Sequence, residues 1–222
     1  MERLLERRGL DPGGSALGAA PDPEALRELA PALGLHAADL FVLAGLPVPE
    51  DLAPLDPGAS RWASGIVQAG ADLSAAGRRE LLDAVRALPQ RERTVPFGPG
   101  PDEPRSDGPG GRVARLFRQR NLGLSGLAEV LGVVTPSYLA MSTHRRFGDD
   151  RLGPAPRLLA DYAALAGIDV RDLSALTGLP RPEPPPPVAP LTADSAALLW
   201  ELRRLSAGQA HEVARSLSVH GA

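Results

Sequence analysis

The chain of 222 residues contains no cysteine and no lysine, so all 24 of its cationic residues are arginines. Without cysteine it has no disulfide, thiolate nucleophile or zinc finger. Without lysine it has neither a phosphate-binding loop of the Walker type nor Schiff-base chemistry. These two absences exclude several large classes of enzyme and metalloprotein.

Aromatic residues make up only 4% of the chain, whereas hydrophobic residues make up 43%. Such a composition predicts small aliphatic cores, which favour helices over a sandwich or barrel. No apolar run approaches the roughly 18 residues of a membrane span, and the N-terminus has no signal-peptide pattern. We therefore expect an all-α, cytoplasmic protein without membrane association. Its wealth of Ala, Gly, Pro and Arg is typical of GC-rich bacterial genomes.

Two segments rich in proline divide the chain. Residues 94–111, TVPFGPGPDEPRSDGPGG, hold five prolines and five glycines, too many for a helix or strand. Residues 179–191, LPRPEPPPPVAPL, predict a semi-rigid polyproline spacer. The expected organisation is a degenerate helical copy with its tail helices at 1–92, a linker at 93–111, a helix-turn-helix domain at 112–180, and a proline-rich spacer with a C-terminal helix pair at 181–222.

The two halves of the chain are similar in sequence. Residues 23–47 and 156–180 share ten identities in 25 aligned positions, among them Asp39 with Asp172 and a closing Gly-Leu-Pro. A similarity this long predicts a duplicated domain rather than a solenoid. The first copy has no counterpart to the leading helices of the second, either because it is truncated or because its start codon is misassigned.

Each copy is expected to end in a pair of tail helices, over 60–70 and 74–88 in the first and over 194–204 and 206–219 in the second. Ser74 and Ser206 are natural N-caps for the later helix of each pair. The apolar faces of the pairs predict that they pack together as a four-helix bundle about a pseudo-twofold axis. Trp62 and Trp200 are expected to anchor that interface.

Residues 124–148, LSGLAEVLGVVTPSYLAMSTHRRFG, predict two helices separated by a turn. Ser125 suits the N-cap of a helix over 126–131, and Gly132 suits the turn. Thr135 and the proline after it suit the N-cap and first position of the next helix. An amphipathic helix is expected just before this segment, over 112–120. The pattern predicts a helix-turn-helix within 124–147.

With its LAEVLGV, a following cap and SYL, the stretch 112–178 resembles the five-helix DNA-binding domain of the Cro/cI (XRE-type) regulators. The resemblance implies a helix over 136–145 that enters the major groove of double-stranded DNA. Residues 112–152 support DNA contact, because they carry seven arginines against three acidic residues. Phosphate contacts are expected from Arg118, Arg120, Thr135, Arg145 and Arg146, and base contacts from Ser137, Thr143 and His144.

The sequence leaves a second interpretation open. The turn is one residue longer than in the family, and the base-facing positions lack the Arg, Gln and Asn that make paired hydrogen bonds to bases. The chain would then be a helix-turn-helix scaffold for a protein partner, or a homodimer formed through the tail helices. A regulator that senses a ligand between its two lobes is a third possibility. The four histidines have no metal-ligand spacing, and we expect no enzyme activity, metal or cofactor.

Overall fold

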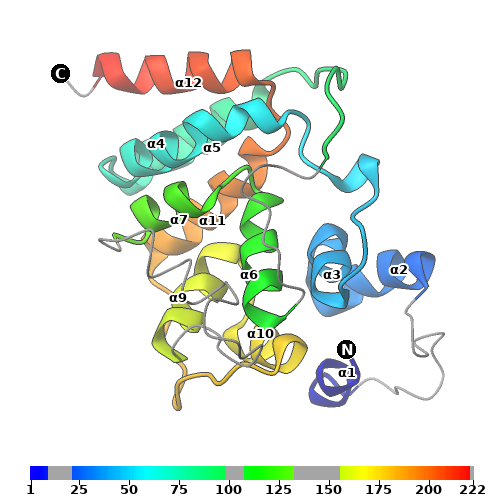
Figure 1. Cartoon of the computed structure of the whole chain (residues 1–222). Helices are drawn as coiled ribbons and strands as arrows, with labels where there is room; N and C mark the ends of the chain where they lie inside the picture. Colours follow the sequence, from blue (N-terminus) through cyan, green and yellow to red (C-terminus); the bar gives the residue numbers. More distant parts are fainter. Residues whose placement is uncertain (10–21, 99–107, 133–155, 221–222) are drawn as a thin grey trace.

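The computed structural model describes residues 1–9, 22–98, 108–132 and 156–220, and within these ranges the chain is helical and has no strand, which confirms the all-α class (Figure 1). None of the described helices has the length and apolar character needed to cross a membrane. The described α-helices are α1 (Glu2–Arg7), α2 (Pro23–Leu33), α3 (Ala37–Ala44), α4 (Ser60–Ala71), α5 (Ala75–Ala87), α6 (Pro109–Arg118), α7 (Leu124–Val130), α9 (Pro156–Ala166), α10 (Val170–Thr177), α11 (Pro190–Leu202) and α12 (Ala207–His220).

Two short 3-10 helices, Glu50–Leu52 and Pro57–Ala59, lead from α3 into α4. The predicted tail helices correspond to α4 and α5 in the first half and to α11 and α12 in the second. α4 lies against α12, and α5 lies against α11, so each helix of one pair contacts a helix of the other (Figure 1). Ile66 and Val85 of the first pair and Leu199 of the second are fully buried. The predicted association of the two pairs is therefore present.

The N-caps of α5 and α12 are the two predicted serines. Ser74 Oγ accepts a hydrogen bond of 3.2 Å from the Gly77 amide. At the start of α12, Ser206 Oγ accepts from the Gln209 amide at 3.3 Å, and Gln209 Oε1 accepts from the Ser206 amide at 3.1 Å. This reciprocal pair is a capping box, which satisfies two amides that the helix itself leaves unpaired.

Two helix pairs, α2 with α3 and α9 with α10, lie below the bundle in Figure 1. α2 ends at Gly34 and α3 at Gly45, both with the left-handed backbone that glycine adopts at the end of a helix. α9 and α10 end in the same way, at Gly167 and Gly178. The local endings agree with the sequence repeat, although the duplication itself stays a prediction.

Helix α6 lies between the two halves of the chain, with α3 on one side and α9 on the other (Figure 1). It begins at Pro109, three residues before the expected start at Arg112, and so includes the end of the predicted linker. Proline is favoured in the first helical turn, where its missing N–H has no partner to lose. Buried residues from both halves form one hydrophobic core, so the predicted domains share their packing.

Candidate functional site

The predicted DNA-contacting residues divide into two groups in the structure. Arg118 and Arg120 lie at the C-terminal end of α6 and are described. The other six fall outside the described residues: Thr135, Ser137, Thr143, His144, Arg145 and Arg146. The described part of the predicted helix-turn-helix is therefore its first helix and the beginning of its turn.

That first helix is α7, and it begins at Leu124, with Gly123 rather than Ser125 at the N-cap. Leu127 and Ala128 are buried, as a face for a neighbouring helix requires. The neighbour is α4 of the tail bundle, and a Cβ atom built on Gly126 would lie 3.2 Å from Ser64 Cβ. The predicted turn residue Gly132 has φ +65°, a left-handed conformation that glycine adopts without strain.

Arg118 is half-buried and lies against the segment before residue 99. Its guanidinium carbon is 4.9 Å from the centre of the Phe97 ring, and Nη2 donates to the Gly98 carbonyl. Burial lowers the pKa of Arg118. A contact between Arg118 and a DNA phosphate would therefore compete with its contacts to Phe97 and Gly98.

Arg120 is not a surface residue. Its side chain is 1% exposed, and Nη1 and Nη2 each donate at 2.8 Å to one carboxylate oxygen of Asp39, which is itself fully buried. The same nitrogens donate to the carbonyls of Leu116 and Ala166. The predicted phosphate contact of Arg120 is therefore wrong, because this guanidinium is bound inside the protein, where it joins α3, α6 and the end of α9.

A second buried carboxylate has the same type of partner. Asp172 of α10 is 1% exposed at its side chain and is bound by two arginines at the end of α1. Arg7 Nε donates to Oδ1 at 2.8 Å, and Arg8 Nη2 donates to Oδ2 at 2.5 Å. Sequence reasoning missed both buried pairs. The signal was the identical position of Asp39 and Asp172 in the two similar stretches of sequence.

Trp200 of α11 connects the bundle to α3. One face of its indole stacks on the His36 ring, with centroids 3.3 Å apart and planes at 5°. The Arg203 guanidinium carbon is 4.0 Å from the indole centre, and burial, helped by the charge of Arg120, lowers the pKa of Arg203 to about 10. Trp62 stacks on His211 in the bundle. Trp62 thus lies at the expected interface between the two helix pairs, whereas Trp200 lies where the bundle meets α3.

The stacked histidine gives a prediction about pH. Burial lowers the pKa of His36, so the unfolded chain, with a histidine pKa of about 6.5, takes up the proton more readily than the folded one. The contribution of neutral His36 to the free energy of unfolding should therefore be lost as the pH falls through about 6.5. His36→Phe keeps a ring for Trp200 and should flatten the change in urea midpoint between about pH 7.5 and about pH 5.5. An unchanged pH dependence in this variant would contradict the assignment to His36.

The described residues contain no group of three or more His, Cys, Asp or Glu side chains placed to bind a metal ion. Comparison of the chain with protein-family models, curated proteins and solved structures found no match.

Proposed function

We propose that the protein is a transcriptional regulator of the Cro/cI type that binds double-stranded DNA through the helix-turn-helix in residues 124–147, in the cytoplasm of a bacterium. The observation that carries the proposal is the order of elements around α7. Helix α7 follows α6 and ends at Val130, and after it come the left-handed Gly132 and then Thr135 and a proline. The described helices α6, α7, α9 and α10, together with the helix predicted over 136–145, make the five that the resemblance implies.

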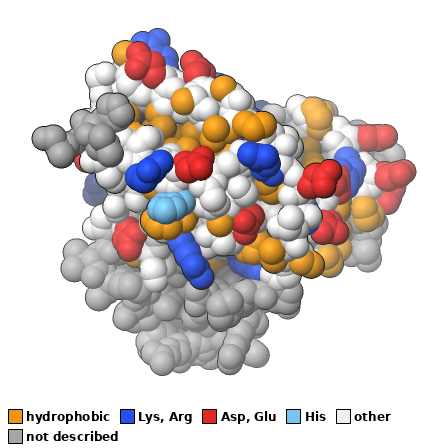
Figure 2. Space-filling view, turned by 90° about the horizontal axis from the view of Figure 1, so that it is seen from above, with side chains coloured by type: hydrophobic (Ala, Val, Ile, Leu, Met, Phe, Trp, Pro, Cys, Tyr) orange, Lys and Arg blue, Asp and Glu red, His pale blue; other side chains and the backbone are white. Residues whose placement is uncertain are grey.

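The excess of arginine in residues 112–152 also supports DNA contact there, but the structure shows that two of these arginines are bound within the protein. Of the arginines in 112–132, Arg112 donates to the Leu43 carbonyl at 3.0 Å and Arg120 is buried. The proposed phosphate contacts are therefore Arg145 and Arg146, with Thr135 at the helix start and Arg118 in addition. Ser137, Thr143 and His144 remain the proposed base contacts. The top of the bundle offers no alternative surface, since its described Arg and acidic side chains are interspersed (Figure 2).

The proposal is tested by the salt dependence of DNA binding. Each phosphate contact contributes about 0.9 to the slope of log K against log salt. Changing both Arg145 and Arg146 to alanine should lower that slope by about two and weaken binding to all sequences. The measurement is fluorescence anisotropy with fragments that the wild-type protein retains from GC-rich genomic DNA, each titrated at several salt concentrations.

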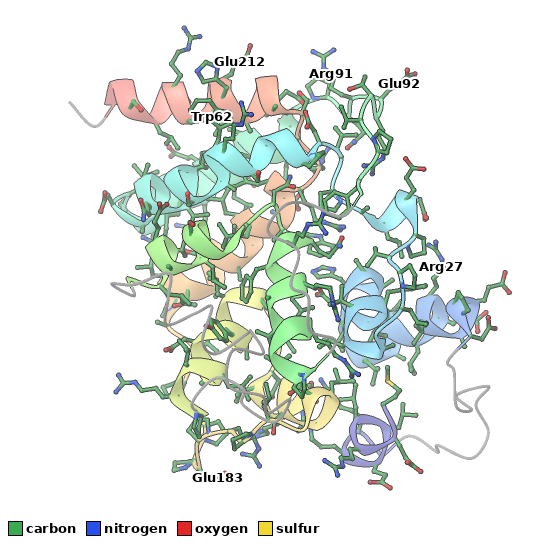
Figure 3. The ribbon with its side chains drawn as sticks, in the orientation of Figure 1. Arg27, Trp62, Arg91, Glu92, Glu183 and Glu212 are labelled. Carbon is green, nitrogen blue, oxygen red and sulfur yellow. The ribbon has the colours of Figure 1, made fainter. Side chains whose placement is uncertain are left out.

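A matched control removes the same charge elsewhere. Arg79 and Arg91 are exposed, and Arg91 projects from the far end of the bundle (Figure 3). Arg79→Ala/Arg91→Ala should leave the slope unchanged. Equal slopes for the wild-type protein and the Arg145→Ala/Arg146→Ala variant would refute the assignment. Absence of DNA binding by the wild-type protein would refute the function.

The internal use of Arg120 and the cover over Arg118 favour a second candidate, a helix-turn-helix scaffold that binds a protein partner. Such a scaffold needs no phosphate contacts from α6. It is distinguished from a DNA-binding regulator by a stoichiometric partner that co-purifies after nuclease treatment and is lost when the segment 133–147 is altered.

A further inference from the structure

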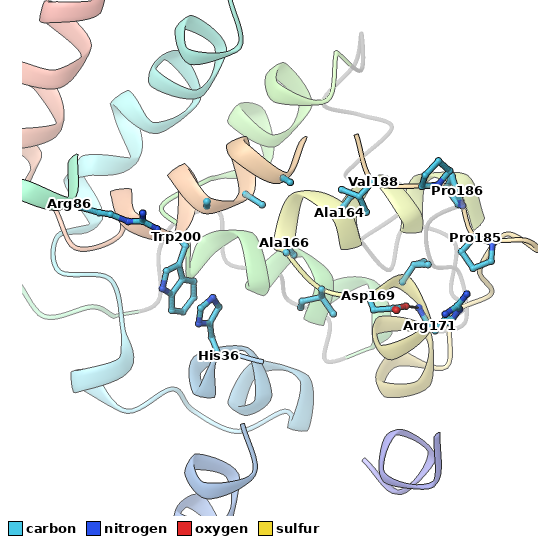
Figure 4. Close-up of a pocket in the computed structure, with 17 residues that line it drawn as sticks. His36, Arg86, Ala164, Ala166, Asp169, Arg171, Pro185, Pro186, Val188 and Trp200 are labelled. Carbon is cyan, nitrogen blue, oxygen red and sulfur yellow. Dashed lines mark hydrogen bonds between the residues drawn. The ribbon is translucent and has the colours of Figure 1, made fainter. Parts of the chain in front are cut away.

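A cavity of about 740 Å³ opens between α9, α11, the start of α10 and the proline-rich segment before α11 (Figure 4). Its walls are more apolar than polar and consist mainly of short side chains, with His36, Arg86, Asp169 and Arg171 as the titratable residues among them. They include Ala164 and Ala166 from α9, Ala193, Ala196 and Ala197 from α11, and Val188 with three consecutive prolines from the connecting segment. The sequence allowed a ligand pocket between the two lobes as a third possibility, but it did not indicate which residues would line the pocket.

The composition of the walls explains why the cavity stays open. Alanines on facing helices leave space that larger side chains would fill. α11 cannot move inward, because Leu198, Leu199 and Leu202 bind it to the rest of the core. The wall over 185–187 is made of prolines, whose fixed φ resists bending. Interiors rarely hold voids larger than a water molecule, whereas preformed ligand sites occupy roughly 300–1,000 Å³.

The two ends of the cavity differ. Trp200 and His36 lie at one end, and Asp169 and Arg171 lie at the other, near Pro185 (Figure 4). Asp169 is already engaged, because its Oδ1 accepts from the Arg171 amide at 2.7 Å. The Arg171 side chain is exposed and has no partner among the described residues. The second end therefore presents a cation that is available to a ligand.

Exposed apolar surface gathers at the same place. Three large hydrophobic side chains are exposed in the described part of the chain, and two of them are Val188 at 54% and Leu191 at 39%. Val188 lines the cavity, and Leu191 lies three residues further along. Exposed apolar side chains at the edge of a hollow are typical of a binding site.

We propose that this cavity binds a small apolar molecule with one anionic group, of the class of aliphatic or aromatic carboxylates. The apolar body lies between the alanines of α9 and α11 and extends toward the edge of Trp200. The carboxylate lies at the mouth, where it pairs with Arg171. The proposal does not depend on DNA binding.

The test uses 1-anilinonaphthalene-8-sulfonate, a fluorescent probe with an apolar body and one anionic group, with decanoate as competitor. The full chain should bind the dye at one site and release it on addition of decanoate. Ala197→Phe fills the cavity from α11 and should weaken dye binding by about tenfold or more. Arg171→Gln keeps the shape but removes the charge and should weaken it by about twofold to fivefold.

Ala84→Phe is the matched control, because it places the same ring on an exposed position of α5 and should leave dye binding unchanged. If Ala197→Phe does not fold, as judged by circular dichroism, Ala193→Phe fills the same cavity from an exposed position. Dye binding that neither filling variant weakens would overturn the site. Dye binding equal in Arg171→Gln and the wild-type protein would overturn the anionic class of ligand.

Discussion

Replacing Asp39 with alanine is expected to lower the free energy of unfolding by about 3–5 kcal/mol. The substitution removes the one carboxylate that binds Arg120 among the described residues, in a place where the arginine side chain is 1% exposed and cannot turn to water. An unpaired buried charge costs more than the pair contributed, because its desolvation is no longer offset. Urea denaturation followed by far-ultraviolet circular dichroism measures the change.

Two variants show whether the loss comes from the stranded charge. Asp39→Leu/Arg120→Met removes both charges and should recover most of the stability that Asp39→Ala loses. Asp51→Ala breaks an exposed pair with Arg27, which projects from α2 (Figure 3), and should have no measurable effect. If Asp39→Ala behaved like Asp51→Ala, the buried pair would not stabilise the fold as we infer.

Local features of the fold could be predicted from the sequence. The helices of the tail bundle, the caps at Ser74 and Ser206, and the left-handed end at Gly34 depend on residues within one or two helical turns. The hydrophobic period and the capping residues are local signals that extend over one or two helical turns. For this reason the expected and observed boundaries of the tail helices lie close together.

The role of Arg120 could not be predicted in this way. In the amphipathic helix predicted over 112–120, Arg120 lies at the C-terminal end, close to Arg118. An arginine in such a position is ordinarily exposed. Its burial depends on Asp39, which is 81 residues away in the sequence. The same limit hid α1, because six residues are too few to show a helical period, although Leu4 and Leu5 are fully buried.

The two ion-pair clusters connect opposite halves of the chain. Asp39, in the first half, is bound by Arg120 from the second, and Asp172, in the second half, is bound by Arg7 and Arg8 from the first. Buried charges are therefore paired across the two halves in both directions. We expect the two halves to unfold together, because neither contains all the partners of its own buried charges.

The second cluster should respond to substitution differently from the first. Asp172 has two cations, Arg7 on Oδ1 and Arg8 on Oδ2, whose side chains are 30% and 40% exposed. Either arginine alone leaves the carboxylate paired, so Arg7→Ala and Arg8→Ala should each cost about 1 kcal/mol or less. The double variant leaves Asp172 buried and unpaired and should cost about 3 kcal/mol, well above the sum of the two.

Urea denaturation of the four proteins of this double-mutant cycle gives the coupling energy directly. Asp172→Leu, added to the double variant, should restore stability, because it removes the charge that the two substitutions stranded. Additive effects of the two arginine substitutions would mean that Arg7 and Arg8 act independently of Asp172. The burial of Leu4 and Leu5 in the common core would then be the main attachment of α1, and that attachment would depend on apolar contact rather than on charge.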